Sequence, residues 1–84
     1  MNNQWLITFR SVTFAQKAQR LLQQSHIQAS MQRTPRELSQ RGCGYCLRIS
    51  GRQALQAVEI LRQRGAEFGK AYAITQNGLE EREP

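Results

Sequence analysis

The sequence predicts an α+β fold in which one antiparallel sheet is covered on one face by two helices. Four short segments alternate side chains with the period of a strand, and two longer segments repeat apolar residues with the period of a helix. These segments follow one another as strand, helix, strand, strand, helix, strand. No linker separates them into two units, so the chain is expected to form a single layered domain.

The first strand is predicted over residues 5–9, where Trp5, Ile7 and Phe9 share one face. The first helix is predicted from about Val12 to Gln24, with Ser11 or Thr13 as the N-cap. Polar side chains cover the outer face of this helix. Its apolar face is formed by Phe14, Ala18, Leu21 and Leu22.

The second strand is predicted over residues 27–32, which alternate weakly, as is typical of an edge strand. A loop over residues 34–42 follows, since Pro35 cannot continue a ladder. The third strand is predicted over residues 45–50, with Tyr45, Leu47 and Ile49 on its apolar face.

The second helix is predicted from about Arg52 to Arg64, with Gly65 at its C-terminal cap. Residues 68–74 predict the fourth strand, and residues 77–84 predict a frayed acidic tail after a domain of residues 1–76. Right-handed crossovers then place the strands in the order 4-1-3-2. This is the ferredoxin-like βαββαβ arrangement, with both helices on one face.

The charge of the chain is strongly basic. Its 84 residues carry a net charge of +6, and residues 1–79 contain 11 basic and 3 acidic residues, a net of +8. Such a surface suits phosphate-bearing partners, including nucleic acid, but does not specify a ligand. No segment has the length of a membrane span, the start does not resemble a signal peptide, and two cysteines cannot form a disulfide framework, so the expected location is cytoplasmic.

Cys43 is the candidate for chemistry. The predicted topology brings the loop before it to the edge of the sheet where the first helix begins. A helix N-terminus, arginines and backbone amides all stabilise a thiolate and lower the pKa of a cysteine. The residues expected to support the Cys43 thiolate or its substrate are Pro35, Arg36, Ser39, Arg41, Gly42 and Gly44.

Cys46 is predicted to play a lesser part, as a secondary thiol or as a small strand residue. In an extended strand it points away from the face of Tyr45 and Leu47, which Cys43 shares. The two cysteine α-carbons then lie about 10 Å apart, too far for a disulfide. His26 is the only other soft metal ligand, so zinc would require a dimer, and no metal or cofactor is expected.

The run from Thr34 to Ser39, followed by Cys43, Gly44 and the segment 47–49, resembles a family of small bacterial selenium/sulfur carrier-like domains. The opening segment 6–11 resembles the first strand of that family, so the likeness covers nearly the whole chain. The resemblance implies that Cys43 holds sulfur or selenium as a persulfide or selenylsulfide. A donor protein and an acceptor protein are the implied partners. A two-cysteine mechanism with Cys46 is not implied.

Three functions remain open from the sequence. The first is a carrier that passes sulfur or selenium on by thiol exchange at Cys43. The second is a basic RNA-binding domain, and the third is a small regulatory or interaction module that forms a homodimer through its sheet. Patterns typical of hydrolases, kinases and nucleotide-binding proteins are missing, so a classical enzyme is not expected.

Overall fold

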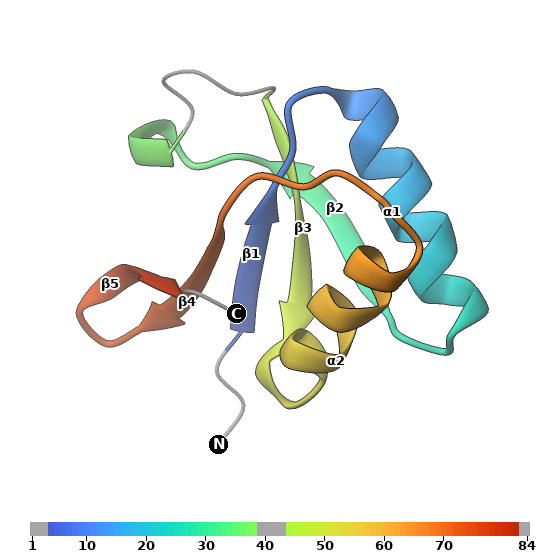
Figure 1. Cartoon of the computed structure of the whole chain (residues 1–84). Coiled ribbons are helices and arrows are strands. Elements are labelled where there is room, and N and C mark those ends of the chain that lie inside the picture. Colours follow the sequence, from blue (N-terminus) through green and yellow to red (C-terminus); the bar gives the residue numbers. More distant parts are fainter. Residues whose placement is uncertain (1–3, 39–43, 83–84) are drawn as a thin grey trace.

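The computed structural model describes residues 4–38 and 44–82. Its strands form one sheet in the order β2-β3-β1-β4-β5, and every neighbouring pair is antiparallel. Both α-helices lie on one face of this sheet (Figure 1). In chain order the elements are β1 (Gln4–Thr8), α1 (Val12–Gln24), β2 (Ala29–Arg33), the 3-10 helix η1 (Arg36–Leu38), β3 (Tyr45–Ser50), α2 (Gly51–Gln63), β4 (Ala71–Thr75) and β5 (Gly78–Arg82).

The predicted α+β class with two helices and an antiparallel sheet is confirmed, but the sheet has five strands and not four. The predicted four-stranded ferredoxin-like sheet is therefore wrong in its strand number. The first four strands lie in the order β4-β1-β3-β2, and β5 is added outside β4.

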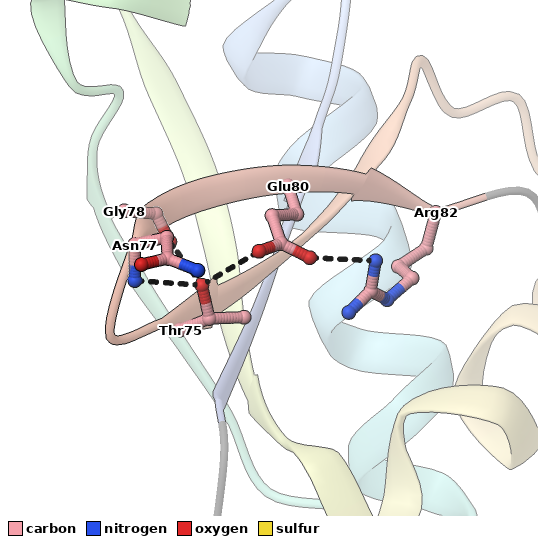
Figure 2. Close-up of polar contacts among 5 residues, drawn as sticks. All are labelled: Thr75, Asn77, Gly78, Glu80 and Arg82. Atoms are coloured by element: carbon pink, nitrogen blue, oxygen red, sulfur yellow. Dashed lines mark hydrogen bonds and ion pairs between the residues drawn. The ribbon is translucent and has the colours of Figure 1, made fainter.

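The prediction of a frayed tail over residues 77–84 is also wrong, because residues 78–82 form β5. Gly78 has a φ of 106°, a left-handed conformation that a tight hairpin needs after its two corner residues. Figure 2 shows how the hydroxyl of Thr75 organises this turn: Oγ1 accepts the Asn77 N–H at 3.1 Å and lies 3.1 Å from Glu80 Oε2.

The core lies between the helices and the sheet. Alternate residues of the strands face α1 and α2, and small alanines on both helices let the backbones approach closely. The largest side chains that are both fully buried and part of this cluster are Ile7, Phe9, Leu22, Ile27, Leu47, Ile49, Val58 and Leu61. These residues come from both helices, from β1 and β3, and from the turns after β1 and before β2, so the core packing also positions the ends of these strands.

Two strands start later than predicted, and for the first of them the end of α1 explains why. The second strand begins at Ala29 and not at Ile27, because Ile27 donates its N–H to Leu22 O at 2.8 Å and so belongs to the turn that ends α1. The fourth strand begins at Ala71 and not at residue 68.

Among the described residues, no helix is long and apolar enough to span a membrane.

Candidate functional site at one edge of the sheet

Four chain segments meet at one edge of the sheet, by which we mean here the side on which strands end and begin and not the outer side of an edge strand. β1 and β2 end there, and β3 and α1 begin there (Figure 1). The register shows this directly, since Cys46 near the start of β3 lies opposite Thr8 at the end of β1 and opposite Gln32 near the end of β2. This convergence follows from the antiparallel pairing of a central β3 with both of its neighbours.

The loop between β2 and β3 is closed at its base. Thr34 donates its N–H to Gly44 O at 2.8 Å, one pair beyond the last strand pair of Arg33 and Tyr45. Within the loop, Leu38 donates its N–H to Pro35 O at 2.9 Å and thereby forms η1. The two ends of the loop are thus held together by the ladder itself.

The described loop residues that the sequence predicted for the site lie close to this base. Pro35 is half-buried, whereas Arg36 and Gly44 are exposed. Apart from its chain neighbours, no described residue lies within 4 Å of where a Cβ added to Gly44 would be. The other predicted site residues, Ser39, Arg41, Gly42 and Cys43, lie outside the described residues.

Cys46 is fully buried, with 0% of its surface exposed. Its register partner Thr8 lies on the face of the sheet away from the helices, whereas Leu47 faces the core cluster. The register therefore confirms the prediction that the side chains of Cys46 and Leu47 lie on opposite faces of the sheet. A thiol in this position cannot meet the cysteine of another protein unless the structure opens.

Two arginines flank this edge, and the guanidinium group of each lies near an aromatic ring. The guanidinium carbon of Arg33 lies 5.7 Å from the centroid of the Tyr45 ring, and that of Arg10 lies 5.6 Å from the Phe14 ring. Arg10 also pairs with Glu67 at 3.2 Å. Because both partners of that pair are well exposed, with side chains 71% and 59% accessible, water screens it and its contribution to stability is small.

The N-terminus of α1 adds a positive partial charge to the same edge. Ser11 caps the helix by accepting the Phe14 N–H on its side-chain oxygen at 3.3 Å. No acidic residue occupies the first turn of α1, so the helix itself supplies no carboxylate to offset its dipole. The predicted N-cap at Ser11 is confirmed, and Thr13 lies within the helix.

One contact at this edge has no counterpart in the predictions from sequence. The end of β1 is bound to the chain that follows α2: Thr8 O accepts the Gly69 N–H at 2.7 Å, and Thr8 Oγ1 accepts the Lys70 N–H at 2.9 Å. A Cβ on Gly69 would lie 2.5 Å from Thr8 Oγ1, so only glycine fits. The glycine was visible in the sequence, but its partner is 61 residues away.

His26 lies at the opposite end of β2 from this edge, in the turn between α1 and β2. It is exposed, as expected for a turn residue. Among residues 4–38 and 44–82, no group of three or more histidine, cysteine, aspartate or glutamate side chains is placed to hold a metal ion.

Comparison with known proteins identifies a family. A family model described as Putative Se/S carrier protein-like matches residues 4–73, which include β1 to most of β4 and the loop that contains Cys43. No curated protein and no solved structure matches the chain. The matched residues end before β5.

Proposed function

The chain belongs to the Se/S carrier protein-like family, and on this basis we propose that it carries sulfur or selenium on Cys43. In the proposed reaction, the Cys43 thiolate attacks the outer sulfur of a donor persulfide. A new sulfur–sulfur bond forms on Cys43, the bond to the donor cysteine breaks, and the donor leaves as a thiolate that takes up a proton. The oxidation level of the transferred sulfur is unchanged, so no external oxidant or reductant is needed.

Delivery is the same exchange in reverse. An acceptor thiolate attacks the outer sulfur on Cys43, and Cys43 leaves as a thiolate. A selenium atom would be carried in the same way as a selenylsulfide. This chemistry needs an accessible thiol whose charged form is stabilised, and a loop that lets a second protein approach.

The observation that carries this proposal is the setting of Gly44, the direct neighbour of Cys43 in the chain. Gly44 is exposed and tied to Thr34 at the base of the loop, and apart from its chain neighbours no described residue lies within 4 Å of where its Cβ would be. The N-terminus of α1 lies at the same edge, and its first turn contains no acidic residue. Arg36 is exposed nearby in the same loop, and Ser39 and Arg41 are proposed to support the substrate from within the loop.

The buried Cys46 fits this role less well. A carrier thiol must be attacked along the axis of a sulfur–sulfur bond by another protein, and a thiol with no exposed surface offers no approach. We therefore assign the carried atom to Cys43 and a packing role in the sheet to Cys46.

The test is a mass measurement on the intact protein after incubation with a cysteine desulfurase and cysteine. The wild type and Cys46→Ser are expected to gain the mass of a single sulfur atom, and Cys43→Ser is expected to gain none. Treatment with a thiol reductant should remove the added mass. Equal loading of Cys43→Ser and wild type would refute the assignment, and so would alkylation of Cys43 no faster than that of free cysteine at neutral pH.

The alternative of RNA binding through the open sheet face has weaker support. Single-stranded RNA is usually held by aromatic side chains that stack on its bases. Among the described strand residues, the register places one aromatic side chain, Tyr72, on the face away from the helices. Binding of RNA that falls steeply with salt and is unchanged by Cys43→Ser would favour this alternative.

A further inference from the structure

β2 is an edge strand whose outer side carries backbone groups without a partner strand. Among the described strands, β2 pairs with β3 alone. Because Thr34 bonds to Gly44 and bonding alternates along an antiparallel ladder, the N–H and C=O groups of Ala29, Met31 and Arg33 point outward. The unbroken register of β2 and β3 keeps this alternation along the whole strand.

The helix α1 covers only the first of these outward groups. Gln19 donates its side-chain N–H to Ala29 O at 2.9 Å. Among the described residues, no hydrogen bond engages the outward backbone groups of Met31 and Arg33. Met31 is half-buried and Arg33 is exposed, so the uncovered half of the edge is the half that leads into the loop before Cys43.

The charged residues of α1 and β2 are all basic: Lys17, Arg20 and Arg33. Residues 4–36, which include α1 and β2, contain five basic residues and no acidic residue. The first acidic residue of the chain is Glu37, in η1. The opposite edge of the sheet is β5, which carries Glu80 and Glu81 and ends at Arg82. The outer edge of β2 is therefore cationic where α1 and β2 form it, and Glu37 in η1 is the acidic residue that follows it in the chain.

We propose that this edge binds an extended acidic segment of a partner protein, which adds to the sheet as a strand beside β2. The outward groups of Met31 and Arg33 would bond to its backbone, and the cationic surface would select its carboxylates. RNA could bind to the positive charge of this edge, but it has no peptide backbone to pair with the outward N–H and C=O groups of β2. A second copy paired through its own β2 would bring two cationic edges together, which opposes that dimer.

The proposal rests on the carrier function only for the identity of the partner, which would be the sulfur donor or acceptor. A segment bound beside Arg33 lies next to the base of the Cys43 loop, so docking there would bring the cysteine of a partner to the carrier thiol. The docking itself is a property of β2 and is tested without sulfur chemistry.

The probe is a blocked peptide of alternating valine and glutamate, about six residues long, which matches a typical strand. Binding is followed by amide hydrogen exchange of the labelled protein at each residue. The amides of Met31 and Arg33 should exchange fast in the unbound protein and at least about tenfold more slowly with saturating peptide. The amides of β5 should be unaffected. A peptide with lysine in place of glutamate should give no protection.

The deciding variant is Met31→Pro, with Met31→Ala as its matched control. Proline is tolerated on an edge strand where the N–H faces outward, so the fold should survive while one outward donor is lost. Both variants remove the methionine side chain, but only Met31→Ala keeps the donor. We expect Met31→Pro to bind the peptide about tenfold more weakly than Met31→Ala.

Several outcomes would overturn the proposal. These are equal binding by the two variants, protection of the β5 edge in place of β2, or protection of Met31 by a second copy of the chain in the absence of peptide. Displacement of the peptide by a short oligouridylate, with Met31→Pro binding the oligonucleotide as well as wild type does, would assign the surface to RNA. Loading of sulfur onto Cys43 without peptide protection would refute the docking while leaving the carrier function standing.

Discussion

His26 ends the helix α1 in a backbone conformation that is usually left to glycine. Its φ is 63°, and the two hydrogen bonds that close the turn run from His26 N–H to Gln23 O and from Ile27 N–H to Leu22 O. Helix α2 ends in the same way, but there Gly65, with a φ of 68°, occupies the equivalent position. The two helix ends therefore share one backbone geometry, with histidine at the positive-φ position of α1 and glycine at that of α2.

This pair predicts opposite effects of two substitutions. His26→Gly should raise the free energy of unfolding by about 0.5–1 kcal/mol, because glycine adopts a positive φ without steric cost and this gain exceeds its entropic cost in the unfolded chain. Urea unfolding measures the change. Gly65→Ala is the control and should lower the free energy of unfolding by about 1 kcal/mol, although the added Cβ would meet no atom within 4 Å. A loss of stability in His26→Gly would mean that the imidazole makes a contact that outweighs the backbone cost.

The two cysteines show how far a single residue depends on its place in the sheet. Their spacing suggests a pair, but Cys46 lies within β3 with no exposed surface. Cys43 precedes the first described residue after the loop, Gly44, which is exposed. The assignment of the carried atom to Cys43 alone stays a proposal that mass measurement can test.

At the scale of the elements, the β4–β5 hairpin is the part of the fold that the sequence analysis missed. The dipeptide Asn77-Gly78 favours a tight turn, but the strongly charged residues after it are typical of a solvated tail. In the structure those charges are compatible with a strand because β5 is an edge, where Arg82 pairs with Glu80 at 3.1 Å and Lys70 pairs with Glu81 at 3.7 Å. The edge position therefore accounts for the composition.

The hydroxyl of Thr75 predicts how this hairpin would be weakened (Figure 2). Thr75→Val keeps the shape of the side chain but removes the acceptor of the Asn77 N–H and the contacts to Gly78 O and Glu80. We expect the amides of β5 to exchange faster, in line with a loss of about 1 kcal/mol of local stability. Thr75→Ser, which keeps the hydroxyl, should exchange more like wild type. If β5 amides in Thr75→Val keep their wild-type protection, the strand pairing alone holds the hairpin.

At the scale of the whole molecule, net charge and size together predict a dependence of stability on salt. The chain carries a net charge of +6, and its longest extent is 32 Å. At about 0.01 M salt the screening length is roughly 30 Å, so every charge acts on every other, whereas at about 0.15 M it is roughly 8 Å. The thermal midpoint should therefore rise between these salt concentrations, because screening weakens the repulsion that opposes the compact state.

A charge variant tests whether repulsion is the cause. Lys17 and Arg20 are exposed on α1, which contains no acidic residue. The double variant with glutamine at both positions should show a smaller rise of the midpoint with salt than wild type. A midpoint that falls as salt is added would contradict the prediction, since it would mean that the exposed ion pairs of Arg10, Lys70 and Arg82 contribute more than the repulsion costs.

The fold class could be predicted because its signals are local. The strand over residues 45–50 and the cap at Ser11 depend on neighbours a few residues away, and the structure shows both where they were expected, with Leu47 and Ile49 buried but Tyr45 exposed. The family likewise followed from short runs of residues, and the family match confirms it. The role of Cys43 was also read from such a run, and it remains a proposal.

Other features of the protein are decided only by the tertiary structure, because they depend on residues far apart in the chain. The burial of Cys46, the close approach of Gly69 to Thr8 and the pairing of β5 with β4 arise when the sheet is assembled. The open outer edge of β2 is also decided by assembly. It exists because β2 is the outermost strand of the described sheet, with β3 on its inner side. The sequence by itself determined which segments form strands and helices, because those preferences act over a few residues. It did not determine which side chains and edges stay open to a partner, because that depends on the assembled layers.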